Sequence, residues 1–186
     1  MKTKQIYDLL LCKIIKAPAA TKQWGKTFEH ISTEIIWKTI TSPLIPPSVF
    51  NTDFKIRHRI MYTSIILHQI NKNRWSRDCT ACESHPETVQ HIFLECPSSK
   101  AFRDQLWQLI TNKCNLQVVG TLKDQIQLFG LFIPAPKNVN SVLINFLFSV
   151  AKHALYICRC DLLFENKKCN SWFLYVGLVS WYLKSF

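Results

Sequence analysis

The chain has 186 residues and a formal net charge of +11, and it contains only 4 glycines among many apolar and aromatic residues. This length suits one domain or slightly more, with about 70% of the unfolded surface buried. The composition favours helices. The first residues do not predict a secretory signal, because the apolar run after the basic start is broken by Cys12 and Lys13 and lacks a small-residue cleavage site.

Two helices are predicted before the first cluster of prolines. Residues 4–16 and residues 22–40 both repeat apolar side chains at spacings of three and four, which is the pattern of an amphipathic helix. Pro43, Pro46 and Pro47 then form a stiff connector that no helix crosses.

A basic helix is predicted next. Asp53 suits the N-cap of a helix over residues 54–71. Strict alternation at the start of this segment also fits a strand, but its length favours a helix. On a helix, Lys55 and Arg59 share one face while Arg57 points nearly the opposite way, so only part of this group can meet one phosphate backbone.

Four ligand-type residues follow in the order C-x2-C-x8-H-x4-C. Cys79, Cys82, His91 and Cys96 offer three thiolates and one imidazole in two short pairs, which suits a single tetrahedral Zn²⁺. We call residues 79–96 the knuckle. Four protein ligands leave no open position for water or substrate, so the predicted zinc is structural. His85 is a rival ligand, but the spacing between His91 and Cys96 favours His91.

The second half of the knuckle is predicted to be helical. Pro86 and Glu87 suit the first turn of a helix that carries His91. A straight helix would separate His91 and Cys96 by about 140°. Because Pro97 disfavours helical geometry at the residue before it, we expect the chain to leave the helix just before Cys96. The apolar residues between His91 and Cys96 are expected to anchor the knuckle on a larger body.

The rest of the chain is predicted to be helical and very apolar. Helices are expected from Ser98 or Ser99 to Lys113, with Leu109 on the buried face, over Leu122–Phe129, over residues 141–164 and over residues 172–183. Charged residues interrupt the third of these, so we expect a buried core helix and no membrane span. The last is apolar on nearly every face, which suits a core helix, an interface or a membrane-surface anchor. The remaining cysteines are expected to be ordinary core thiols: Cys12, Cys114, Cys158, Cys160 and Cys169.

Basic and aromatic residues lead into the knuckle. Residues 1–78 hold thirteen Lys and Arg against five Asp and Glu, so this half is the expected nucleic-acid face, although a solvated basic surface has the same composition. Cations beside an aromatic ring suit phosphate contact together with base stacking. The candidates for nucleic-acid contact are Lys55, Arg57, Arg59, Lys72, Arg74, Trp75 and Arg77.

The sequence resembles the zinc-binding carboxyl-terminal region of LINE-type (non-LTR) retrotransposon reverse transcriptases. The resemblance is carried by Cys-Thr-Ala-Cys at residues 79–82, by Pro-Glu-Thr-Val-Gln-His-Ile-Phe-Leu-Glu-Cys-Pro at residues 86–97 and by the basic segment before them. It implies that Cys79, Cys82, His91 and Cys96 are metal ligands, and that the region helps to hold element RNA or target DNA. The chain has no polymerase aspartate motif and no nuclease segment, so we do not expect it to be an enzyme on its own.

These observations predict a mainly α protein, an irregular helical bundle with a small CCHC zinc knuckle docked on it. The expected organisation is an N-terminal helical segment over residues 1–45, a basic helix with the zinc-binding region over residues 50–113, and an apolar helical region over residues 114–186. The expected cofactor is one structural Zn²⁺. We expect an intracellular protein, in the nucleus or the cytoplasm, because the metal site implies reduced cysteines.

The expected partners are RNA or single-stranded or target DNA, with a retrotransposon reverse transcriptase or another protein binding residues 171–186. One alternative is a zinc-stapled structural or protein-interaction remnant that does not bind nucleic acid. Another is a decayed element copy that never folds. Metal content and salt-dependent nucleic-acid binding distinguish these hypotheses.

Overall fold

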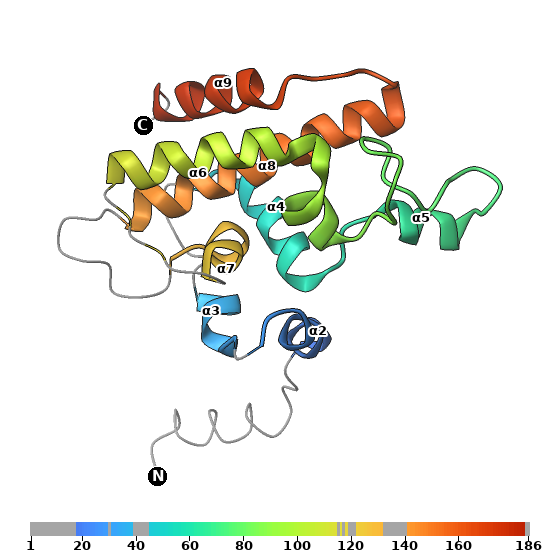
Figure 1. The fold of residues 1–186 in the computed structure, drawn as a ribbon, viewed down its shortest axis with the longest axis horizontal. Helices are drawn as coiled ribbons and strands as arrows, with labels where there is room; N and C mark the ends of the chain where they lie inside the picture. The colour runs from blue at the N-terminus through green and yellow to red at the C-terminus, as the bar shows by residue number, and fades with distance from the viewer. Residues whose placement is uncertain are drawn as a thin grey trace, which may run out of the picture.

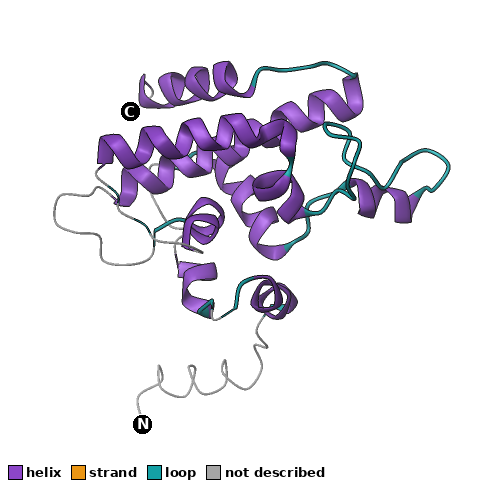
Figure 2. Cartoon of the chain, in the orientation of Figure 1, coloured by secondary structure: helices purple, strands orange, loops and turns teal. Residues whose placement is uncertain are grey.

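The computed structural model describes residues 18–29, 31–38, 45–114, 116, 118, 122–131 and 141–184. Most of these residues are helical, and the part of the chain that the structure describes contains no strand apart from one antiparallel bridge between Asp78 and Pro86 (Figure 2). The predicted mainly α class is confirmed. The predicted helix over residues 4–16 lies outside the described residues.

The longest described helix, α8 (Ser141–Glu165), forms the axis of the fold (Figure 1). It packs against α4 (Pro47–His58) and against α9 (Ser171–Lys184), which lies on the outside of the molecule. The other described helices are α2 (Ala19–Thr27), α3 (Thr33–Lys38), α5 (Ser64–Ile70), α6 (Lys100–Cys114) and α7 (Leu122–Phe129), with a short π-helix η1 (His91–Glu95) and a 3₁₀ turn η2 (Pro97–Ser99).

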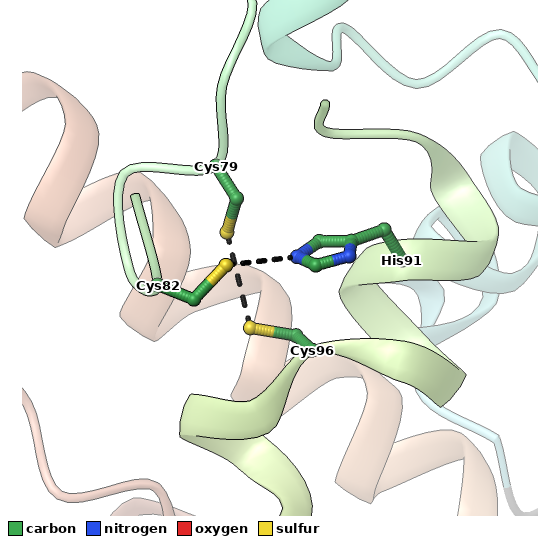
Figure 3. Close-up of side chains that lie close together, drawn as sticks. All are labelled: Cys79, Cys82, His91 and Cys96. Carbon is green, nitrogen blue, oxygen red and sulfur yellow. Dashed lines mark hydrogen bonds between the residues drawn. The ribbon is translucent and has the colours of Figure 1, made fainter. Parts of the chain in front are cut away.

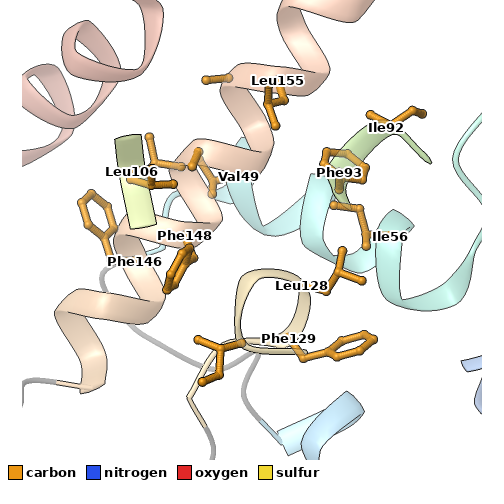
Figure 4. Packing of buried hydrophobic residues seen from close by; sticks show 14 of the residues in the cluster. Val49, Ile56, Ile92, Phe93, Leu106, Leu128, Phe129, Phe146, Phe148 and Leu155 are labelled. Atoms are coloured by element: carbon orange, nitrogen blue, oxygen red, sulfur yellow. The ribbon is translucent and has the colours of Figure 1, made fainter. Parts of the chain in front are cut away.

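One hydrophobic core joins most of these elements (Figure 4). Ile56 from α4, Phe93 from η1, Leu128 from α7 and Phe148 from α8 are almost completely buried. Burial of each such side chain stabilises the fold by about 1.5–3 kcal/mol. Because η1 contributes Phe93 to this core, the knuckle is docked on the helical body, as its apolar residues predict.

The apolar helix α8 is buried in part and carries an internal ion pair. It is the only described helix long and apolar enough to cross a membrane, and half of its most apolar stretch is buried in the structure. Lys152 lies 2.5 Å from Asp53 of α4, and both side chains are shielded from solvent. Ser149 donates a hydrogen bond to the same carboxylate. These contacts fix α8 on α4.

The predicted helix over residues 22–40 is two helices. Phe28 is extended after α2, and the Ser32 hydroxyl accepts a hydrogen bond from the Ile35 N–H at the start of α3. A serine side chain that satisfies a free N–H favours a new helix start over continuation of the previous helix. The prediction of one continuous helix is therefore wrong.

The predicted helix over residues 54–71 is also divided. It begins earlier, at Pro47, with Pro46 at the N-cap position, and it ends where Arg59 adopts a left-handed conformation with φ 54°. Asp53 is buried in the middle of α4 and paired with Lys152, so its predicted role as an N-cap is wrong.

Two details of the C-terminal helices differ from expectation. In α6, Leu109 is 38% exposed, so the prediction that it lies on the buried face is wrong. Cys158 and Cys169 form a disulfide that links the end of α8 to the segment before α9, so these two are not ordinary thiols. Cys114 and Cys160 are free and half-buried.

Candidate metal centre

The first half of the knuckle is a tight chain reversal. The Cys79 N–H donates to the His85 carbonyl at 2.8 Å, and the Glu83 N–H donates to the Cys79 carbonyl at 2.7 Å. Glu83 completes the turn in the left-handed region, with φ 54°. This turn directs both thiols of the C-x2-C pair toward one point (Figure 3).

The left-handed Glu83 supports a prediction about the turn. Glu83→Gly is expected to raise the free energy of unfolding by about 1 kcal/mol, because only glycine adopts this region without a steric cost. Glu83→Val is expected to lower it by a similar amount. Urea denaturation of the metal-loaded protein measures both changes. Equal destabilisation by the two substitutions would contradict the described turn.

The second half of the knuckle places His91 and Cys96 on the same side. The His91 N–H donates to the Thr88 hydroxyl at 3.0 Å, so Thr88 caps the helical segment that begins at Val89 and continues into η1. The predicted helical start at Pro86 is therefore wrong. The Cys96 N–H donates to the His91 carbonyl at 2.7 Å, five residues back. This π-helical turn, which is frequent at functional sites, removes the 140° separation of an α-helix. The expected exit before Cys96 is confirmed.

The four predicted ligands meet at one point. The Sγ atoms of Cys79 and Cys96 are 3.8 Å apart, and the Cys82 Sγ lies 3.3 Å from His91 Nε2 (Figure 3). All four donor atoms lie within 4.8 Å of one another. Cys79, His91 and Cys96 are buried. This cluster can hold one metal ion. His85 is exposed and stacks its ring on that of His91, outside the cluster.

The thiols of the C-x2-C pair differ in acidity. Burial raises the pKa of Cys79 to about 12, with the backbone N–H groups of Cys82 and Ala81 acting in the opposite direction. Burial also raises the pKa of Cys82, but hydrogen bonds from Ser84, His91 and Cys79 outweigh it and bring this pKa to about 6. The lowered pKa of Cys82 favours its thiolate form, and a cation bound beside Cys79 would favour ionisation of that thiol too.

A buried ion pair fastens the knuckle to the helical body. Glu87 is 1% exposed, and its Oε1 accepts hydrogen bonds from the Ser64 N–H at 2.7 Å and from Arg159 Nη2 at 2.6 Å. Arg159 also donates to the Tyr62 carbonyl at 2.8 Å. The carboxylate that sequence reasoning placed in a helical first turn therefore joins the knuckle to α5 and α8.

Two further contacts hold the end of the knuckle. The Ser98 hydroxyl donates to the Ala81 carbonyl at 2.7 Å. This hydrogen bond links the turn that carries Cys79 and Cys82 to η2, so Ser98 does not cap α6. The buried Arg103 side chain donates to the Cys96 carbonyl at 3.0 Å. Its positive charge lies beside a cluster that is rich in thiols.

Four of the seven candidates for nucleic-acid contact lie together. Lys72, Arg74, Trp75 and Arg77 line a surface hollow of about 550 Å³ next to the knuckle. The loop that carries them is held by the Asn71 side chain, which accepts from two backbone N–H groups, and by His68, whose Nδ1 lies 2.6 Å from the Trp75 carbonyl. We call residues 72–77 the basic loop. Its three cations are exposed, and no carboxylate among the described residues forms an ion pair with them.

The other three candidates lie elsewhere. Arg57 is 2% exposed and donates to the carbonyls of Ile36 and Phe129, so the prediction that it contacts a nucleic-acid backbone is wrong. Arg59 is half-buried over the Trp24 ring. Lys55 lies on α4 and extends over the Tyr156 ring of α8. Neither Arg59 nor Lys55 lines the hollow.

Sequence reasoning missed the residues that support the cluster, namely Thr88, Arg103 and Arg159. Thr88 stands three residues before His91, which is a local capping signal that the sequence does contain. Arg159 lies 72 residues from Glu87, and no local pattern predicts that pair. No protein-family model and no curated protein matches the chain.

Proposed function

We propose that the chain is a zinc-binding, nucleic-acid-binding module of the kind found in the carboxyl-terminal region of LINE-type retrotransposon reverse transcriptases. The observation that carries the proposal is the position of the basic loop, which presents three exposed cations directly before the first ligand of the Cys/His cluster. In this proposal the metal ion stabilises the fold of the knuckle, and the basic loop binds the phosphates of the nucleic acid.

Zinc is the proposed ion because the donor set and the distances suit it. Three thiolates and one imidazole are typical zinc ligands, and a tetrahedral ion with Zn–S bonds of about 2.3 Å places two sulfurs about 3.8 Å apart. The distance between the Sγ atoms of Cys79 and Cys96 is 3.8 Å. The four protein donors fill a tetrahedral shell, so we propose a structural role for the ion and no catalysis at it.

A single strand, and RNA in particular, is the proposed ligand. The basic loop is short and irregular, and no described helix presents its cations as a recognition helix would. Trp75 is half-buried, with the Arg74 guanidinium 4.9 Å from its ring and Phe164 of α8 against its edge. Cations around an aromatic ring suit unpaired nucleotides, where phosphates and bases are both accessible.

The salt dependence of RNA binding tests this proposal. If Lys72, Arg74 and Arg77 each meet one phosphate, the slope of log K against log salt is about −2 on single-stranded RNA. Replacing all three by Gln is expected to remove this slope and most of the affinity. Fluorescence anisotropy with a labelled single strand, titrated at several salt concentrations, measures both.

A matched control separates the basic loop from the general positive charge. Lys22, Lys26 and Lys113 are exposed and lie on α2 and α6, so their joint replacement by Gln lowers the net charge by the same amount. This control is expected to retain the affinity and the slope. Equal losses of RNA affinity in the two variants, or binding that does not depend on salt, would contradict the proposal. The alternative of a structural module that does not bind nucleic acid would then be favoured.

A further inference from the structure

The outward face of α9 is apolar and is fixed in its orientation. Phe173 is 76% exposed, Trp181 62%, Leu183 54% and Val176 47%. At 100° per residue these four side chains fall within an arc of about 160°. They form one continuous stripe, which we call the outer face of α9.

The opposite side of α9 packs against the rest of the fold. Tyr175 is buried against Phe102 of α6, with ring centroids 5.8 Å apart. Tyr182 is also buried, and its hydroxyl lies 3.1 Å from the Ser48 hydroxyl of α4. Turning the outer face inward would break these contacts. The apolar stripe is therefore exposed in the part of the chain that the structure describes.

The charged residues of the segment that carries this stripe, residues 166–184, are all lysines, and Glu165 at the end of α8 lies just before them. Lys167 and Lys168 precede α9, and Lys184 lies in its last turn; all three are exposed. From residue 166 to residue 184 the chain contains no Asp or Glu. An apolar helical face with cations at both ends is the pattern of a helix that lies in a membrane interface and is attracted to anionic lipid.

The dimensions and the charge argue against a second copy of the chain as the occupant. Fourteen residues make a helix about 21 Å long and about 10 Å wide, so a helix pair has a footprint of about 200 Å² on each copy. Stable interfaces bury about 1,200 Å² or more in total. Two copies would also bring together chains that each carry a net charge of +11.

We infer that the outer face of α9 binds the surface of an anionic lipid bilayer, with Phe173, Trp181 and Leu183 inserted among the lipids and the three lysines at the headgroups. The helix lies parallel to the bilayer and does not span it, because its inner face stays packed on α6 and α8. This activity is separate from the proposed nucleic-acid binding, which uses the basic loop.

Co-sedimentation of the full chain with lipid vesicles tests the inference. Binding is expected with vesicles of phosphatidylcholine and phosphatidylserine, and much less with phosphatidylcholine alone. Phe173→Ser with Leu183→Ser is expected to lower the partition coefficient at least about tenfold. Lys167→Gln with Lys168→Gln is expected to lower it about 30-fold, since each lysine near an anionic surface contributes about 1 kcal/mol.

Matched controls make the test specific. Ile60 and Ile70 are 54% and 67% exposed on other elements, and their replacement by Ser is expected to leave vesicle binding unchanged. Lys22→Gln with Lys26→Gln and the basic-loop variant are expected to bind vesicles like the unchanged chain. Circular dichroism checks that every variant is folded.

Three outcomes would overturn the inference. The first is binding that is independent of phosphatidylserine. The second is an equal loss of vesicle binding in the control variants, which would show that the attraction does not depend on the outer face of α9. The third is a dimer in light scattering that Phe173→Ser abolishes while vesicles do not bind, since the occupant would then be a second copy of the chain.

Discussion

Removing the metal is expected to unfold the knuckle while the helical core stays folded. Ordering the eighteen residues of the knuckle costs conformational entropy, and structural zinc offsets part of this cost with about 10–16 kcal/mol of binding free energy. We therefore expect Cys79→Ser, or treatment with a chelator, to abolish amide protection over residues 77–96.

Hydrogen exchange measured by mass spectrometry locates this change. Peptides from α4 and α8 are expected to remain protected, because these two helices also hold each other through the Asp53–Lys152 pair and through apolar side chains outside the knuckle. Cys114→Ser is the matched control, since Cys114 is a half-buried thiol outside the cluster. Unchanged protection of residues 77–96 after metal removal would show that packing alone holds the knuckle.

Breaking the buried pair between Glu87 and Arg159 is expected to destabilise the protein by about 3–5 kcal/mol. Glu87→Gln leaves the Arg159 guanidinium, whose side chain is 8% exposed, without a counter-charge. The Ser64 N–H also loses a charged acceptor. Urea denaturation of the metal-loaded protein measures the loss.

The double substitution Glu87→Met with Arg159→Met distinguishes a specific pair from a general packing defect. It is expected to recover a large part of the lost stability, because two apolar side chains of similar length leave no buried charge. Glu95→Gln serves as the control, since Glu95 is exposed at the end of η1. A Glu87→Gln variant within about 1 kcal/mol of the unchanged protein would contradict the role of this pair.

The ligands could be predicted from the sequence because their chemistry is local. Cys79 and Cys82 are three positions apart, and His91 and Cys96 are five apart, so a local turn or a helix end is enough to bring each pair together. The proline after Cys96 also gave a correct exit from the helix. The contacts that dock the knuckle join residues far apart, such as Glu87 and Arg159, and sequence periodicity contains no information about them.

The positions of the basic residues could not all be predicted from the sequence. Lys55, Arg57 and Arg59 alternate with apolar side chains, and this pattern does not reveal that Arg57 donates to carbonyls of α3 and α7 in the core. Arg57 is buried because its helix is covered from several sides. The helix over residues 54–71 was predicted as one element for a similar reason. Its break at Arg59 depends on tertiary packing that overrides helix propensity.

The apolar C-terminal helix was predicted correctly as an element, but the sequence left open which of its faces is exposed. Residues 172–183 are apolar on nearly every face, and the sequence does not decide which face is buried. The structure buries the side that carries Tyr175 and Tyr182. The choice depends on the position of Phe102 and Ser48, which come from two other helices.

The metal content of the purified chain tests the central claim most directly. Native mass spectrometry is expected to show one zinc ion on each chain, retained in Cys114→Ser and lost in both Cys96→Ser and His91→Ala. A folded chain that carries no metal, or one that keeps its zinc in the Cys96→Ser and His91→Ala variants, would contradict the assignment of this cluster as a structural zinc site.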